Sequence, residues 1–267
     1  MILSLQNLTF SYQNHRVLHN VSFSIKEGEF FCILGPNGVG KSTLFRCILG
    51  MNTGYKGEIQ IENKPLRVYT TKELAQYISY IPQYTTPIFS YTVFQVVLMG
   101  TTAKLSMFGN PQKKQEEKAL FALRQLGIEI LKNKRIDEIS GGERQLVLIA
   151  RAIAQDAKLI IMDEPTANLD YGNQVRVLEV LHYLTKKGYS ILMSTHNPEH
   201  AFLYGTYVVM LKNGEIVSKG TPREALTEQV LSDTYGVEIG LRQIVDGERT
   251  YQICIPKGGS SYGISME

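Results

Sequence analysis

Residues 35–42 have the types and spacing of a phosphate-binding loop. They read Gly35, Pro36, Asn37, Gly38, Val39, Gly40, Lys41 and Ser42, which fits G-x-x-x-x-G-K-[ST]. Small residues let backbone N–H groups point inward at an anion, and a helix beginning near Lys41 adds the positive end of its dipole. Lys41 can reach the β- and γ-phosphates of a nucleotide, and the Ser42 hydroxyl can bind Mg²⁺. A glycine-rich turn that only starts a helix is the alternative, but the strand-like run before the loop favours phosphate binding.

Two adjacent carboxylates, Asp163 and Glu164, follow the apolar run of residues 159–162. Ligands of α/β folds bind at the carboxyl ends of buried parallel strands. Asp163 is suited to hold Mg²⁺, through water, and Glu164 can polarise an attacking water. An ordinary acidic turn before Pro165 is the alternative, and the phosphate loop upstream argues against it.

A third motif, Ser140-Gly141-Gly142-Glu143, precedes a helical pattern of apolar residues. The S-x-x-E spacing predicts a capping box. Two glycines at the start of a helix cost roughly 1 kcal/mol each relative to alanine, and a capping box does not need them. They are expected if a phosphate held by another molecule approaches this helix N-terminus. Capping and phosphate binding can coexist here.

These motifs lie among alternating strand-like and helical segments, which predicts an α/β fold with a mostly parallel sheet. The predicted core strands are Phe30–Leu34, Leu159–Asp163 and Tyr189–Thr195. Two further β features flank them: a hairpin turning at Asn213-Gly214 and a strand over Gly57–Glu62. The pattern from residue 91 to residue 157 is mostly helical and predicts an insertion into the core.

Composition excludes several classes of protein. The chain has 267 residues, a formal net charge of +3 and three cysteines without CxxC spacing. This excludes a strongly basic nucleic-acid coat, a disulfide framework and a zinc ribbon. Its apolar runs are far shorter than the roughly 20 residues of a membrane-spanning helix, and its N-terminus does not read as a secretory signal. We therefore expect a soluble, cytosolic protein.

From Ile2 to about Pro256 the sequence resembles the ATP-binding subunits of ABC transporters, because the motifs of that family occur in order. They are a Walker A segment (Gly35–Thr43), a Q-loop glutamine (Gln83), a signature (Ile139–Glu143), a Walker B segment (Ile160–Glu164), a D-loop (Asn168–Asp170) and a switch histidine (His196). Three departures are mild: Ile139 replaces leucine, Glu143 replaces glutamine, and Asn197 replaces the frequent aspartate. The resemblance implies a P-loop core with a mostly parallel sheet, an antiparallel β subdomain and a helical insertion.

The resemblance also implies roles for individual residues. Two copies pair head to tail, so that each ATP lies between the Walker A segment of one copy and the signature of the other. Glu164 orients the attacking water and His196 contacts the γ-phosphate. Together with Gln83, which lies at the junction between the core and the helical insertion, they are the expected catalytic residues. Mg²⁺ is held by Ser42, Gln83 and Asp163. Further nucleotide contacts are expected from Tyr12, which faces adenine, and from Thr43, Ser140, Gly141, Gly142 and Asp170.

The expected organisation is one domain over residues 1–256 followed by a polar tail, 257–267. Within it we expect a core of 1–88 and 158–222, a helical subdomain of 89–157 and a C-terminal segment of 223–256. The expected partners are a second copy, integral-membrane permease subunits bound by the aromatic segment Tyr84–Phe94, and indirectly an extracytoplasmic substrate-binding protein, with no nucleic acid. The chain would then work at the cytoplasmic face of the cell membrane.

The cargo class is suggested by three stretches, Tyr91–Gly100, Gly141–Gln155 and Leu231–Pro256. They resemble the importers of iron-siderophore complexes, haem and cobalamin. Importers of molybdate or tungstate, or of zinc or manganese, are alternatives within the family. A soluble ABC ATPase of DNA repair or translation is an alternative of another class, but such proteins usually carry two cassettes, coiled-coil arms or basic extensions.

Overall fold

A six-stranded sheet forms the centre of the computed structural model, which describes residues 1–83, 90–104, 112–247 and 249–258. Its order is β10-β9-β3-β8-β7-β6, with β9 and β6 parallel to the strands between them and β10 antiparallel at the edge. The bounds are β3 Phe30–Leu34, β6 Ile78–Ile81, β7 Leu159–Met162, β8 Ser190–Thr195, β9 Tyr207–Lys212 and β10 Glu215–Gly220. The predicted core strands are confirmed, with β7 ending and β8 beginning one residue inside the predicted bounds.

An antiparallel sheet, ordered β2-β1-β4-β5, covers one face of the central sheet through helix α1. Its strands are β1 Leu3–Tyr12, β2 His15–Ile25, β4 Lys56–Ile61 and β5 Lys64–Pro65, and α1 spans Lys41–Ile48. Alternate β3 residues point to opposite faces: Phe31 and Ile33 pack toward α1, while Phe30, Cys32 and Leu34 pack toward the helices on the other side. The turn η1 Leu66–Val68 and helix α2 Thr71–Leu74 lead from this sheet to β6.

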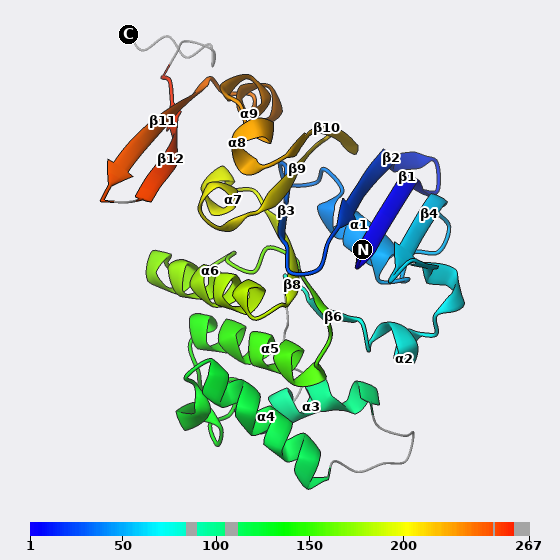
Figure 1. Cartoon of the computed structure of the whole chain (residues 1–267), viewed down its shortest axis with the longest axis vertical. Coiled ribbons are helices and arrows are strands. Elements are labelled where there is room, and N and C mark those ends of the chain that lie inside the picture. The colour runs from blue at the N-terminus through cyan, green and yellow to red at the C-terminus, as the bar shows by residue number, and fades with distance from the viewer. Residues whose placement is uncertain (84–89, 105–111, 248, 259–267) are drawn as a thin grey trace.

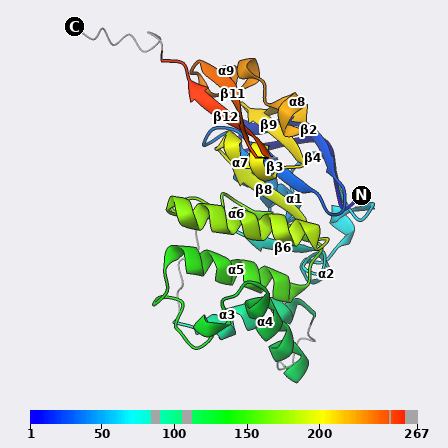
Figure 2. The same cartoon turned by 60° about the vertical axis from the view of Figure 1, so that its left-hand side comes forward.

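The helical insertion packs on the other side of the sheet and forms the lower part of the molecule in Figure 1. Its elements are α3 Val93–Gly100, η2 Thr101–Lys104, α4 Lys113–Gln125, η3 Glu129–Leu131 and α5 Gly141–Gln155. Helices α6 Tyr171–Lys186 and α7 Pro198–Tyr204 follow, and α6 lies beside α5 in both views (Figures 1 and 2). Thr92 caps α3 by accepting a hydrogen bond from Gln95 N on its side-chain hydroxyl.

The C-terminal segment forms the opposite end of the molecule (Figures 1 and 2). It contains α8 Pro222–Ala225, α9 Glu228–Tyr235 and a hairpin of β11 Ile239–Asp246 with β12 Arg249–Pro256. Residues 259–267 of the predicted tail and residues 84–89 of the aromatic segment lie outside the described residues. Within the described ranges, no helix has the length and apolarity to cross a membrane.

Candidate functional site

The phosphate loop joins β3 to α1 and folds around the ammonium group of Lys41. Lys41 Nζ donates hydrogen bonds to the carbonyl oxygens of Gly35 at 2.7 Å and of Pro36 at 3.1 Å. Gly40 ends the loop with φ 108°, a conformation that favours glycine, and as N-cap it offers α1 no side-chain hydrogen bond. The first N–H groups of α1 are thus left for an anion.

A hollow of about 390 Å³ lies over this loop. Its lining is Val17, Asn37, Gly38, Gly40, Lys41, Ser42, Thr43, Gln83 and Glu164. The structure therefore brings together the loop, Gln83 and Glu164, which are far apart in the sequence. Most of the side chains that line the hollow are polar, and Lys41 supplies a positive charge. The hollow therefore suits a polar, anionic ligand.

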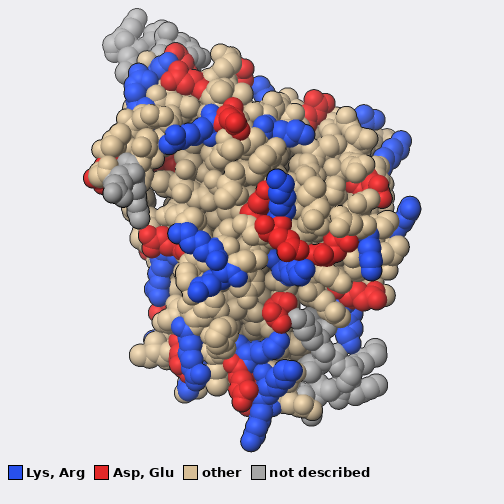
Figure 3. Space-filling view, in the orientation of Figure 1, with Lys and Arg blue, Asp and Glu red and all other residues tan. Residues whose placement is uncertain are grey.

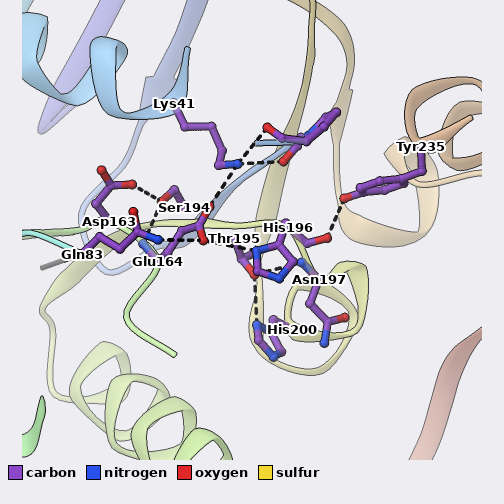
Figure 4. Close-up of polar contacts among 12 residues, drawn as sticks. Lys41, Gln83, Asp163, Glu164, Ser194, Thr195, His196, Asn197, His200 and Tyr235 are labelled. Carbon is purple, nitrogen blue, oxygen red and sulfur yellow. Dashed lines mark hydrogen bonds and ion pairs between the residues drawn. The ribbon is translucent and has the colours of Figure 1, made fainter. Parts of the chain in front are cut away.

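Glu164 is the centre of a polar network in this hollow (Figure 4). Its Oε1 lies 3.2 Å from Lys41 Nζ, and both side chains are buried. Its Oε2 accepts a hydrogen bond from Gln83 Nε2 at 3.3 Å and lies 3.2 Å from His196 Nδ1. Gln83 and His196, which were assigned to catalysis from the sequence together with Glu164, therefore each contact Glu164 directly.

Asp163 is oriented by Ser194, a residue of β8 to which the sequence analysis assigned no role. Ser194 Oγ donates to Asp163 Oδ1 at 2.6 Å and accepts a hydrogen bond from the backbone N–H of Glu164 at 2.9 Å. Glu164 itself has φ 48°, so its backbone turns sharply just after the strand. A single hydroxyl thus fixes the orientation of both acidic residues at the end of β7.

Tyr12 ends β1, and its side chain is 42% exposed. Asn52 Nδ2 donates to its hydroxyl at 3.0 Å, and the Phe10 ring packs against it edge to face. Burial acts to raise the pKa of Tyr12, but hydrogen bonds with Asn52, Thr43 and Arg46 outweigh it and lower the pKa. Tyr12 is held beside α1 with part of its ring accessible, as stacking on an adenine requires.

The signature turn forms the predicted capping box. Ser140 Oγ accepts from Glu143 N at 3.2 Å, and Glu143 Oε2 accepts from Ser140 N at 2.9 Å. The carboxylate of Glu143 also accepts a hydrogen bond from Ser140 Oγ at 2.9 Å, and the bonds from the backbone N–H and then from the hydroxyl of Ser140 lower the pKa of Glu143. Ser140 and Gly141 are exposed at the N-terminus of α5.

Gly142 has a second reason to be glycine, which the sequence does not reveal. A Cβ at this position would overlap the side-chain oxygen of Asn173 in α6. Asn173 is in turn held by Asp170, which caps α6: Oδ1 accepts from Asn173 N at 2.8 Å and Oδ2 from Nδ2 at 2.7 Å. The signature and the D-loop are therefore in contact through Asn173.

The comparisons with known proteins identify the family. The ABC transporter family model matches residues 18–167. The chain belongs to the ABC transporter ATP-binding family. An ABC transporter ATP-binding protein of Haemophilus influenzae is 41% identical over 235 residues, covering 88% of this chain and 89% of the relative.

Two further relatives of this ABC cassette carry more specific descriptions. The ferric enterobactin transport ATP-binding protein FepC of Escherichia coli is 33% identical over 233 residues, covering 87% of this chain and 86% of FepC. A solved chain described as part of a metal-chelate type ABC transporter in an inward-facing conformation has a TM-score of 0.87 and 31% identity. That match covers 97% of this chain and 98% of the other. The predicted family, fold class and ATPase activity are thereby confirmed.

In this cassette the hollow over Lys41 and the signature turn are separate. The residues that line the hollow do not include Ser140, Gly141, Gly142 or Asp170. Figure 1 shows why: α1 lies with the upper sheets, whereas α5 belongs to the lower helical layer. The nucleotide contacts expected from the two regions are thus not made by one hollow of a single chain.

The end of β8, directly before His196, is supported by a buried histidine, His200. Thr195 Oγ1 accepts from Asn197 N at 3.1 Å and lies 3.0 Å from His200 Nδ1. The threonine hydroxyl can then donate its own hydrogen to a neutral imidazole. Burial, with a smaller effect from His196, lowers the pKa of His200 to about 4.

Because the pKa of His200 is lowered in the folded protein, we expect the free energy of unfolding to fall in mild acid. Its ordinary pKa is about 6.5, so the unfolded chain takes up the proton first as the pH falls from there toward the folded value. We expect protonation of His200 in the unfolded chain to lower the free energy of unfolding by about 2 kcal/mol between pH 7 and pH 5. Urea unfolding of the protein and of the His200→Gln variant at both pH values measures this loss of unfolding free energy. An equal loss in the two proteins would contradict the prediction.

Proposed function

We propose that this cassette is the ATP-hydrolysing subunit of an importer whose cargo is a metal chelate of the iron-siderophore type. The observation that carries the cargo class is the similarity to FepC and to the metal-chelate type transporter, which extends over most of each chain. The ATPase chemistry is supported independently by the network of Lys41, Glu164, Gln83 and His196.

Hydrolysis in this proposal requires Lys41 to exchange partners. Its ammonium lies 3.2 Å from Glu164 Oε1 and is also within reach of the loop that would hold the phosphates. When the γ-phosphate enters, Lys41 pairs with phosphate oxygens and Glu164 Oε1 becomes available to a water. Gln83 and His196, which contact the other oxygen, keep the carboxylate in position during this exchange.

The oxygen groups of Ser42, Gln83 and Asp163 fit a magnesium ion. Ser42 and Gln83 line the hollow, and Ser194 orients the Asp163 carboxylate at the adjacent strand end. A hydroxyl, an amide oxygen and a carboxylate are hard oxygen donors, as Mg²⁺ prefers. Bound Mg²⁺ would neutralise charge on the β- and γ-phosphates.

A second copy of the chain completes each nucleotide site. Ser140 and Gly141 are exposed at a helix N-terminus, and the phosphate hollow of the same chain does not include them. A head-to-tail pair would place each exposed turn over the hollow of the other copy. Tyr12, with its partly accessible ring, would contact the adenine of the same nucleotide.

Helix α3 offers a surface for an integral-membrane permease at the cytoplasmic face of the membrane. Tyr91, Gln95, Leu98, Met99 and Thr102 line a mainly apolar hollow of about 200 Å³ on this helix. A short helix of the permease fits such a groove. The substrate-binding protein then acts through the permease. The mixture of basic and acidic side chains on the face in Figure 3 supports a protein partner over a nucleic acid.

Reconstitution with the co-expressed permease tests this function. We expect ATP-dependent uptake of a ferric siderophore into vesicles, and Met99→Glu should reduce this uptake about ten-fold by placing a charge in the α3 hollow. The ATP turnover of the isolated cassette should not change. Val68→Glu, at a more exposed apolar position on η1 (61% against 40% for Met99), is the control and should transport normally.

Two results would contradict the proposal. Uptake of manganese, zinc, molybdate or tungstate in place of the chelate would assign the cassette to another importer group. Normal uptake by Met99→Glu would place the permease contact elsewhere on the surface.

A further inference from the structure

The C-terminal segment reaches the catalytic network through Tyr235. The hydroxyl of Tyr235 donates a hydrogen bond to the backbone carbonyl of His196 at 2.8 Å, as Figure 4 shows. The imidazole of the same His196 lies 3.2 Å from Glu164 Oε2. One residue therefore connects α9, at the far end of the chain, to the group that contacts the catalytic carboxylate.

The tyrosine is firmly placed for this role. It is the last residue of α9, and Gly236, with φ 71°, ends the helix directly after it. Lys212 of β9 donates to the carbonyl of Asp233 at 2.6 Å, which fixes this end of α9 to the central sheet. Burial, the largest effect, raises the pKa of Tyr235, so the phenol stays protonated and remains a donor.

The start of α9 is fixed as well. Glu228 accepts a hydrogen bond from the backbone N–H of Leu241 in β11 at 2.6 Å and pairs with Lys257 at 3.4 Å. The hairpin and α9 therefore form one unit, and Val230, Tyr235, Leu241 and Cys254 pack against the core. A displacement of this unit would be transmitted to the His196 carbonyl.

His196 needs such support because its side chain is 56% exposed and follows the end of β8. The two residues that flank His196 are joined to each other, because Asn197 N donates a hydrogen bond to Thr195 Oγ1. Tyr235 holds the intervening carbonyl from a different element. The peptide plane of His196 sets the direction of its Cα–Cβ bond and hence of the imidazole.

We propose that Tyr235 is a positioning residue for ATP hydrolysis, which orients His196 toward Glu164 and the γ-phosphate and so makes turnover depend on the C-terminal segment. The proposal rests on the role assigned to His196 above. It gives the segment after residue 222 a part in the chemistry, in addition to its packing against the core.

Tyr235→Phe is the direct test, because it removes only the hydroxyl and keeps the ring. We expect kcat for ATP to fall about five-fold, the effect of one lost hydrogen bond, with KM for ATP unchanged. The matched control is Tyr69→Phe, which removes a tyrosine hydroxyl that donates to the carbonyl of Ile61 at 2.9 Å in the antiparallel sheet. This control should turn over normally.

A double-mutant cycle separates positioning from a general loss of stability. If Tyr235 acts through His196, the Tyr235→Phe change should have no further effect on kcat in a His196→Ala protein. An equal five-fold effect in both backgrounds, or a normal kcat in Tyr235→Phe, would overturn the proposal. A normal kcat in His196→Ala alone would instead overturn the role of His196, so the two failures are distinguishable.

Discussion

Glu164→Gln is expected to lower the rate of ATP turnover at least about a hundred-fold, the usual contribution of a general base. Glutamine has nearly the same shape but cannot accept a proton from water. It also removes the anion that lies 3.2 Å from Lys41 Nζ, so Lys41 should be more available to phosphate. ATP should therefore bind at least as tightly as before. Steady-state phosphate release and equilibrium binding of a fluorescent ATP analogue measure the two effects.

The same protein tests the head-to-tail pair. Since ATP persists in the Glu164→Gln variant, ATP-dependent dimers should accumulate and be visible by size-exclusion chromatography. Glu73→Gln, which alters an exposed capping box on α2, is the control and should retain normal turnover. Unchanged turnover in Glu164→Gln would remove this residue as the group that orients water.

The phosphate loop and the strand ends could be predicted from the sequence because their geometry is local. A strand, a glycine-rich turn and a helix in succession determine where Lys41 and Ser42 lie. Likewise, an S-x-x-E pattern before an apolar helix was sufficient to predict the cap on α5. The Asn213-Gly214 turn is a similar case, since both residues have the positive φ that a type I′ hairpin turn requires.

Other contacts could not be predicted, because they join residues that are far apart in the chain. Ser194 meets Asp163 only because β8 pairs with β7, and a lone serine in an apolar strand gives no sign of that role. Tyr235 meets His196 across an interval of 39 residues. The contact of Gly142 with Asn173 is of the same kind: it adds a packing reason for glycine to the approach of a phosphate, which remains a prediction.

Lys41→Ala is expected to weaken ATP binding about a hundred-fold or more, because it removes the cation that charge-assisted hydrogen bonds to phosphate require. Lys41 is 5% exposed and its ammonium is held by Gly35 and Pro36 at the centre of the loop. A neighbouring side chain could not readily replace it at that position. Titration with the fluorescent ATP analogue measures the change, and normal affinity would refute the assignment of the phosphate loop.

The same substitution should also destabilise the fold, for a separate reason. Removal of Lys41 leaves the buried carboxylate of Glu164, which is 8% exposed, without its cation, and breaking such a pair costs about 3 kcal/mol. Lys41→Ala combined with Glu164→Gln removes both charges, so we expect it to regain most of the unfolding free energy. It should not regain ATP binding. Recovery of both would mean that Lys41→Ala weakens binding only by unfolding the site, and the direct contact between Lys41 and phosphate would be refuted.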